Sequence, residues 1–258
     1  LRDISSLIKD LNPEFLNFET ISKLESLDLS SLPELPTGKR IGSCITKPGK
    51  FVAIGLNYSD HAAETGADAP SEPIVFMKAT SSINGPNDDI EIVSGSKKLD
   101  WEVELGIVIG KETKHISQDQ SQDHILGYCL VNDISEREWQ IEKMGQWVKG
   151  KSHDTYGPIG PHLVTKDEIA DINNLNMSLD VNGKRMQTGN TSTMIFNVDF
   201  IVSYLSKFMS LQAGDIITTG TPPGVGMGMK PQQFLKDGDT MKLSIENLGE
   251  QNSKVVAL

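Results

Sequence analysis

The sequence has 258 residues and a formal net charge of −11, from 24 basic and 35 acidic residues. This acidity argues against nucleic acid as a partner, because phosphate binding needs clustered Lys and Arg. Hydrophobic residues make up 37% of the chain, enough for a sizeable core. The longest apolar runs are far too short to span a bilayer, and no N-terminal segment has the pattern of a signal peptide. We therefore expect a cytoplasmic protein that has no contact with membranes.

Residues 1–46 differ from the rest of the chain, because they contain two prolines in the polar stretch SLPELPTGK and no chemistry-bearing cluster. We interpret them as a small N-terminal appendage and linker, and residues 47–258 as the catalytic domain. From residue 47 onward, short apolar runs alternate with Gly, Pro, Asn and Asp clusters, which is typical of a strand-rich fold. The predicted strands are Phe51–Leu56, Ile74–Lys78, Trp101–Ile109, Ile125–Val131, Met177–Val181, Asp215–Thr219 and Met241–Ile245.

Turns and helices complete the pattern. Asn182-Gly183, between strand-like flanks, predicts a tight hairpin. Apolar spacing predicts a helix over Phe196–Phe208, and shorter helices are expected over Ser59–Thr65 and Ser135–Met144. The fold class is therefore α+β, with more strand than helix.

The segment LDWEVELGIVIGK carries the strongest chemical signal. Strict alternation places Trp101 and the apolar residues after it on one face of a strand, and Asp100, Glu102 and Glu104 on the other. Glu102 and Glu104 are about 7 Å apart at their Cα atoms, so their side chains can converge on one cation such as Mg²⁺ or Mn²⁺. The alternative is an amphipathic strand with a solvated acidic face.

A third carboxylate follows the apolar segment ILGYCLVN. Asp133 stands where this predicted strand ends, which is a suitable position for a third metal ligand. Three protein ligands would leave coordination positions for water and substrate. The alternative role for Asp133 is to cap the helix expected after it.

The segment GLNYSDHAAE offers a candidate base. His61 and Glu64 are spaced i, i+3 on the expected short helix, so the carboxylate can orient the imidazole for water activation. The alternative is a chance pair on a surface helix.

Two further segments carry candidate substrate contacts. Lys151, in WVKGKSHDTYGPIGP, could stabilise negative charge on a carbonyl oxygen beside a metal, although a lone lysine also fits an ordinary surface charge. Gly220 and Thr221, in a Gly/Thr/Pro loop after a strand, could present donors to a carboxylate. The loop does not have the glycine spacing of a dinucleotide-binding turn.

From about residue 47 onward, six segments and their order along the chain resemble the fumarylacetoacetate hydrolase family. The segments are GLNYSDHAAE, FMKATSSINGP, DWEVELGIVIGK, YCLVNDISEREWQ, KGKSHDTYGPIGP and TTGTPPGVG. SKKLDWEVELG and GNTSTMIF are most similar to the bacterial branch that contains hydrolases of 2,4-diketo-3-deoxy sugar acids (L-rhamnonate and L-fuconate). The resemblance implies mixed β-sheets around a β-roll and a homodimer.

The resemblance also implies that Mg²⁺ is the cofactor, with Mn²⁺ or Ca²⁺ as substitutes, and it assigns a role to each residue of the site. The metal ligands that it implies are Glu102, Glu104 and Asp133. The catalytic residues that it implies are His61, Glu64 and Lys151. The substrate-binding residues that it implies are Arg137, Gln140, Gly220, Thr221 and Lys78.

The reaction implied is hydrolysis of the carbon–carbon bond of a 2,4-diketo acid, either an acylpyruvate or a sugar acid, to pyruvate and a carboxylic acid. The alternatives are ureidoglycolate lyase or oxaloacetate decarboxylase activity on the same site. An alternative of a different class is a non-catalytic metal-binding or ligand-binding module. The expected partner is a small-molecule 2-oxo acid substrate.

Overall fold

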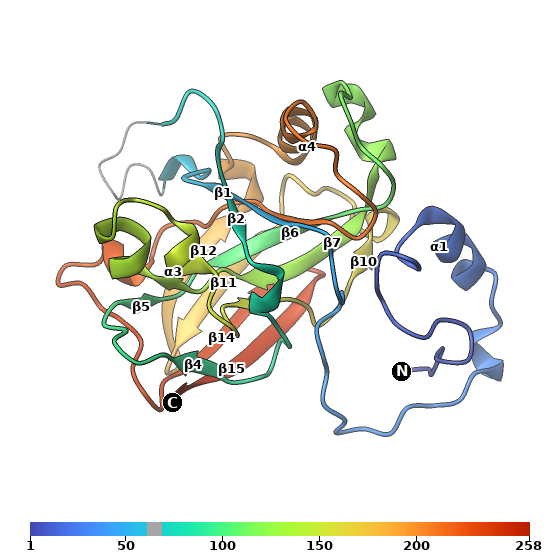
Figure 1. The fold of residues 1–258 in the computed structure, drawn as a ribbon. Coiled ribbons are helices and arrows are strands. Elements are labelled where there is room, and N and C mark those ends of the chain that lie inside the picture. The colour runs from blue at the N-terminus through green and yellow to red at the C-terminus, as the bar shows by residue number, and fades with distance from the viewer. Residues whose placement is uncertain (61–68) are drawn as a thin grey trace.

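Two β-sheets form the centre of the computed structural model, which describes residues 1–60 and 69–258 (Figure 1). One is a mixed six-stranded sheet with the order β10-β7-β6-β13-β1-β2. Its strands are β1 (Phe51–Gly55), β2 (Ile74–Lys78), β6 (Val103–Ile109), β7 (Ile125–Asn132), β10 (Val164–Thr165) and β13 (Ile216–Thr218). All neighbours in this sheet are antiparallel except β1 and β13.

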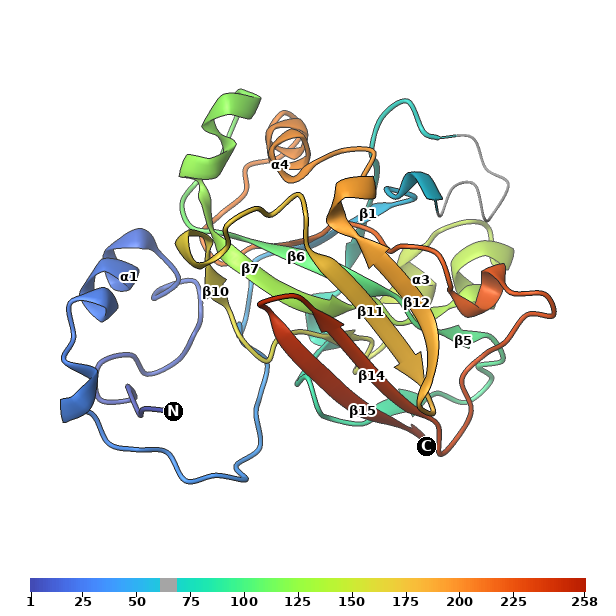
Figure 2. The ribbon, with the colours of Figure 1, turned by 180° about the vertical axis from the view of Figure 1, so that it is seen from behind.

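The second sheet has five strands in the order β12-β11-β14-β15-β4 and is in front when the molecule is seen from behind (Figure 2). Its strands are β4 (Ile90–Ile92), β11 (Asn176–Val181), β12 (Lys184–Asn190), β14 (Thr240–Ile245) and β15 (Gly249–Ala257). Two small sheets pair β3 (Ile83–Asn84) with β9 (Gly157–Pro158) and β5 (Leu99–Asp100) with β8 (Ser135–Glu136).

The main core lies between the two large sheets. Val103, Leu105 and Ile107 of β6 belong to the same buried cluster as Leu179 of β11 and Leu243 of β14. Burying this apolar face drives the packing of the two layers. The opposite face of β6 carries Glu104, Gly106 and Val108, and Glu102 immediately precedes the strand on the same side, so this face is acidic at one end and apolar at the other.

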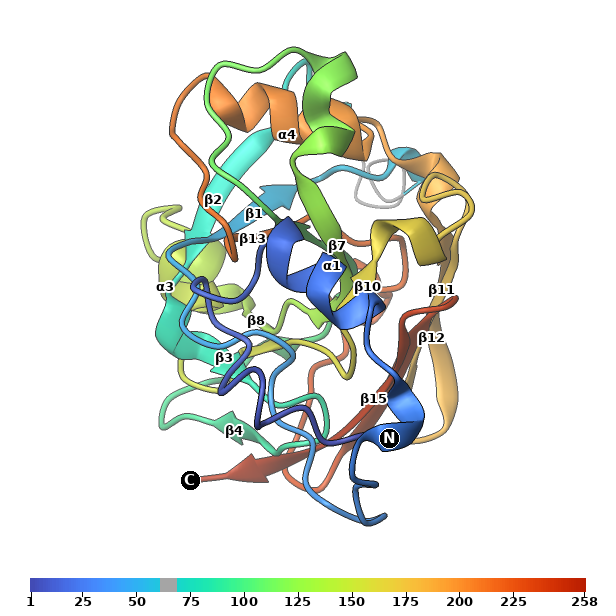
Figure 3. The same cartoon turned by 90° about the vertical axis from the view of Figure 1, so that its right-hand side faces the viewer.

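The N-terminal segment covers the apolar end of that second face. Leu16 is 1% exposed and forms a cluster with Val108, Cys129 and Val131 of β6 and β7. Helix α1 (Phe18–Glu25) follows, and Figure 3 shows it in front of β7 and β10. Residues 1–46 therefore include residues that pack against the sheet, and their separation from residues 47–258 as a distinct domain stays a prediction.

Most predicted elements are present, with two differences. Helix α4 (Val198–Ser206) and the Asn182-Gly183 hairpin between β11 and β12 confirm the expectations, and both hairpin residues have the positive φ of such a turn. The expected helix over Ser135–Met144 is wrong at its start, because Ser135 and Glu136 form β8 and only Glu138–Glu142 is helical, as a π-helix. The expected strand Trp101–Ile109 is interrupted, because β5 ends at Asp100 and β6 begins at Val103.

Helix α3 (Val148–Lys151) completes the helices over the described residues, apart from short 3₁₀ turns. The expected helix Ser59–Thr65 falls largely on residues 61–68, outside the described part of the chain. Within the described part, no helix combines the length and apolar character needed to cross a bilayer.

Candidate metal centre

The pairing of β6 with β7 brings three acidic side chains together. The two strands are antiparallel, with Val103 opposite Asn132, so Glu102 lies opposite Asp133 just beyond the paired region. The Asp133 amide donates to the Glu102 carbonyl at 2.9 Å, which fixes this register. Glu104 is on the same face as Glu102, two residues further along the strand.

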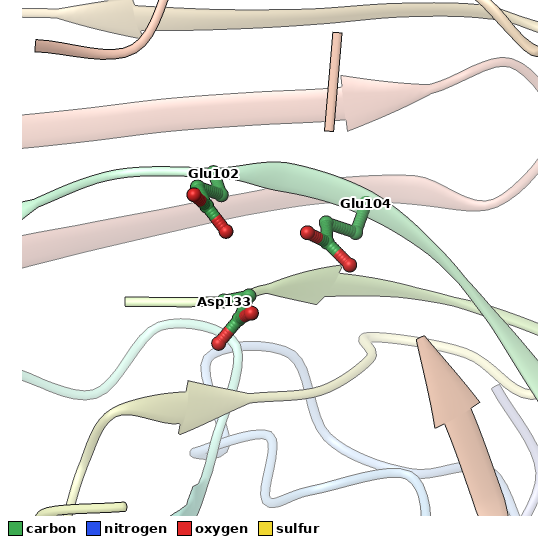
Figure 4. Close-up of side chains that lie close together, drawn as sticks. All are labelled: Glu102, Glu104 and Asp133. Carbon is green, nitrogen blue, oxygen red and sulfur yellow. The ribbon is translucent and has the colours of Figure 1, made fainter. Parts of the chain in front are cut away.

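One carboxylate oxygen from each of Glu102, Glu104 and Asp133 lies within 4.8 Å of the others. Figure 4 shows the three carboxylates turned toward a common space, from β6 and from the end of β7. All three residues are buried, with 6%, 2% and 1% exposure respectively. The alternative of a solvated acidic face is therefore wrong, and so is the helix-capping alternative for Asp133, since its side chain faces this cluster.

Two cations contact the cluster from the side of α3 and β8. The Lys151 ammonium lies 2.7 Å from Glu102 Oε2 and 2.7 Å from Asp133 Oδ2. Nη2 of Arg137 lies 2.7 Å from Glu102 Oε1, while its Nε donates to Asp100 at 2.8 Å. Burial opposes the charged form of Lys151, but the Asp133 and Glu102 carboxylates outweigh it and raise the pKa of this lysine.

Lys78 supports the cluster from behind. Its buried ammonium donates to Asp133 Oδ1 and to the Lys151 carbonyl, and Lys78 is not among the described residues that line the adjacent cavity. The expected contact of Lys78 with substrate stays a prediction, and in this structure the Lys78 ammonium holds Asp133 in place.

Glu104 lacks a direct cationic partner among the described residues. It accepts hydrogen bonds from the Thr218 hydroxyl and, at 2.9 Å, from the Gly220 amide. Burial raises the pKa of the Glu104 carboxyl well above its usual range, and the Asp133 and Glu102 carboxylates raise it further. By contrast, Lys151 and Arg137 outweigh the effect of burial at Glu102 and hold its pKa well below the usual value.

The donor set fits a hard divalent cation. Three buried carboxylates supply oxygen ligands at one point, as Mg²⁺, Mn²⁺ and Ca²⁺ prefer. With Glu104 ionised and Asp100 included, four buried carboxylates face the three cations Lys78, Arg137 and Lys151, which leaves one negative charge for a metal to neutralise. A cation beside Glu104 would favour the ionised carboxylate and so oppose the effect of burial on its pKa.

A cavity of about 210 Å³ opens onto the cluster, large enough for a small organic acid. At its acidic end are Glu102, Glu104, Asp133, Arg137, Gln140 and Lys151. The remaining wall is mostly apolar, with the large side chains of Ile54, Leu56, Phe76, Ile141, Trp147 and Met227, and Gly55, Gly220 and Thr221 complete it.

The other expected substrate contacts also border this cavity. Gln140 lies beside Arg137, whose Nη1 donates to its side-chain oxygen at 3.0 Å. Gly220 and Thr221 line the cavity, but the Gly220 amide is directed at Glu104 and the Thr221 hydroxyl donates to the Val103 carbonyl at 2.9 Å. The expected role of these two donors in binding a substrate carboxylate stays a prediction. His61 and Glu64 lie outside the described residues.

Asp100 is a supporting residue that sequence reasoning did not assign. It is fully buried and accepts from Arg137 Nε, from the Gly226 amide at 2.7 Å and from the Met227 amide at 2.9 Å. Asp100 thereby joins the guanidinium of Arg137 to the loop that carries Met227 of the cavity wall. Its position on the acidic face was visible in the sequence, but its pairing with Arg137 depends on the β5–β8 contact.

The match to known families agrees with this architecture. Residues 50–256 match the family described as "Fumarylacetoacetate (FAA) hydrolase C-terminal". The chain belongs to the fumarylacetoacetate hydrolase family. The predicted strand-rich fold of that family is thereby confirmed.

Similar proteins include both hydrolases and isomerases. A Burkholderia cenocepacia (strain HI2424) protein that bears the name "Putative hydrolase" is 55% identical over 252 residues, which are 97% of this chain and 89% of that protein. The fumarylacetoacetate hydrolase from Exiguobacterium antarcticum is 37% identical, with a TM-score of 0.84 over 90% of this chain and 84% of that one. The 2-hydroxyhepta-2,4-diene-1,7-dioate isomerase from Mycobacterium marinum is 38% identical, with a TM-score of 0.71 over 81% and 75%.

Proposed function

We propose that this protein is a divalent-metal-dependent hydrolase that cleaves the carbon–carbon bond of a 2,4-diketo acid to give pyruvate and a carboxylic acid. The observation that carries the proposal is the convergence of Glu102, Glu104 and Asp133 beside Lys151 at the floor of a small cavity. Membership in a family with hydrolase relatives supports it.

Glu102, Glu104 and Asp133 would hold the cation, for which Mg²⁺ is the first candidate and Mn²⁺ or Ca²⁺ are substitutes. When bound, such a cation supplies Lewis acidity toward the oxygens of a 2-oxo acid. With a divalent cation held by the three carboxylates, the adjacent charges of Arg137 and Lys151 would favour an anionic substrate at the same end of the cavity.

Lys151 is placed to stabilise negative charge. Its ammonium is fixed by two carboxylates and borders the cavity, so it can donate to an oxyanion without costly reorganisation. In the proposed reaction, water adds to the C4 carbonyl and the C3–C4 bond breaks. The bonding electrons go to C3 of the pyruvate fragment, which then takes up a proton.

His61, oriented by Glu64, is our candidate for the base that removes the proton from the attacking water. This assignment rests on the sequence and on the family resemblance. The sugar acids of the branch named above and simple acylpyruvates both satisfy the proposal, because they share the 2,4-diketo acid group.

The test is release of pyruvate from a panel of 2,4-diketo acids, followed with lactate dehydrogenase and NADH. We expect turnover with Mg²⁺ and its loss in EDTA, with recovery when the metal is returned. Turnover that is unaffected by chelation, or no pyruvate from any member of the panel, would refute the proposal.

Isomerisation is the second candidate, because the similar Mycobacterium marinum structure is that of an isomerase. The same set of metal ligands and cations could stabilise the dienolate that an isomerisation of a 2-hydroxydienoate requires. Proton NMR separates the two, since isomerisation moves a double bond without releasing pyruvate.

A further inference from the structure

We propose that the cavity selects substrates whose C4 acyl group carries an apolar tail, and that Trp147 is the residue that sets this preference. The inference rests on the proposed function, because it concerns the part of a 2,4-diketo acid that projects away from the metal centre. It favours alkyl or aryl acylpyruvates over the hydroxylated sugar acids.

Trp147 is positioned by the same helix that carries Lys151. It is the N-cap residue of α3, and Lys151 lies four residues later, so both side chains are on one side of this turn. Both border the cavity, Lys151 at its acidic end and Trp147 on its apolar wall. A substrate held at Lys151 by its oxygens would therefore extend its tail toward the indole.

Neighbouring residues leave room for the indole and hold it in place. A Cβ added at Gly55 would lie 2.5 Å and 2.9 Å from two ring carbons of Trp147, so glycine at the end of β1 is what allows the ring to approach. The Phe76 ring meets the indole edge-on at a centroid distance of 5.1 Å. The Lys151 ammonium also lies over the Phe76 ring, 5.3 Å from its centroid.

This wall offers little to a hydroxylated tail. Of the six large side chains of the apolar wall, Trp147 alone carries a nitrogen or oxygen, its indole N–H. The neutral polar side chains that also line the cavity among the described residues are Thr221 and Gln140, and the Gln140 oxygen accepts from Arg137. The nearby Thr221 hydroxyl is engaged with the Val103 carbonyl and accepts from Gln187 at 2.8 Å. Sugar hydroxyls placed here would lose water without gaining hydrogen bonds from the described wall, which disfavours their binding.

An alkyl tail would bind this wall favourably, because it exchanges contact with water for contact with carbon. Leu56, Phe76 and Met227 are half-buried in the structure, so the wall retains apolar surface that a tail can cover. A difference of one methylene group in such a pocket commonly changes kcat/KM by about tenfold or more.

The experiment compares kcat/KM for two 2,4-diketo acids of equal chain length, one with an alkyl tail and one with a hydroxylated tail. We expect the wild type to favour the alkyl tail by roughly tenfold or more. W147Q should reduce this ratio to about threefold or less, whereas W147F, which keeps an apolar ring and removes the N–H, should retain the preference.

Two additional variants control for folding. I141Q changes a wall residue that is 46% exposed, so it should fold normally and still lower the ratio. W139Q is the matched control, because Trp139 lies in the same segment but outside the described cavity lining, and its ratio should equal that of the wild type.

The outcomes are separable. Pyruvate release from both substrates with a preference for the hydroxylated tail, or with a ratio that W147Q and I141Q leave unchanged, would overturn this inference while the proposed function stands. No pyruvate from either substrate, or from the wider panel, would overturn both.

Discussion

The Lys151 ammonium lies 2.7 Å from Glu102 Oε2, in a pair that is almost completely shielded from water. The same ammonium contacts Asp133, so one cation holds two of the three clustered carboxylates. Breaking such a buried contact leaves uncompensated charge, which is more costly than losing a surface ion pair.

Replacing Lys151 with methionine should therefore destabilise the metal-free protein by about 3 kcal/mol. A divalent cation should restore part of this loss, because it supplies the missing positive charge to the carboxylates. The measurement is the Tm with EDTA and with Mg²⁺, and the metal-induced rise should be larger for K151M than for the wild type. An equal rise in both proteins would show that the cation does not bind beside Lys151.

E102Q should weaken binding of Mn²⁺ by about a hundredfold and abolish metal-dependent turnover, since one charged ligand is removed from a three-ligand site. Isothermal titration with Mn²⁺ gives the affinity. E250Q is the matched control, because the Glu250 side chain is 51% exposed and pairs with Lys242 at the surface. Normal Mn²⁺ affinity in E102Q would remove Glu102 from the ligand set.

H61A should reduce pyruvate release by about 10²- to 10⁴-fold, the usual contribution of a general base, while Mn²⁺ affinity stays near that of the wild type. Kinetics and metal titration on the same preparation test this separation. Equal losses of turnover and metal affinity would contradict a role for His61 in proton transfer alone.

Stability should fall in alkali, because burial raises the pKa of Tyr128 to about 12. An unfolded tyrosine ionises near pH 10, whereas buried Tyr128 stays protonated until about pH 12. The free energy of unfolding therefore decreases as the pH rises from 10 toward 12. Between pH 9 and pH 11 the contribution of Tyr128 is about 1 kcal/mol. Urea unfolding of the wild type and Y128F at these two pH values should show a smaller loss for Y128F, and parallel losses would contradict the assignment.

Strands with alternating or continuous apolar residues could be predicted from the sequence, as β2 and β7 show. Strand β15 could not, because its inward-facing positions include Gln251 and Ser253, which are polar yet buried. Gln251 is accommodated because its amide donates to the carbonyls of Leu130 and Gly160, contacts that exist only after the chain has folded. The pattern of hydrophobic residues carries no record of such long-range partners.

In the candidate site, too, local features could be predicted from the sequence and long-range contacts could not. The spacing of Glu102 and Glu104 on one strand predicts their shared face, because strand geometry is local. Their convergence with Asp133 depends on the β6–β7 register, which spacing does not determine. The π-helical turn after Arg137 and the approach of Trp147 to Gly55 are likewise consequences of tertiary packing, and neither has a signal in local residue preferences.

The most direct test of the metal centre is a crystal structure of the protein grown with Mn²⁺, with diffraction data collected at the manganese absorption edge. An anomalous peak bounded by oxygens of Glu102, Glu104 and Asp133 is the predicted result. A peak at another place on the protein, with Glu102 and Asp133 still paired with Lys151, Lys78 and Arg137 and Glu104 still bonded to Thr218 and Gly220, would contradict the account.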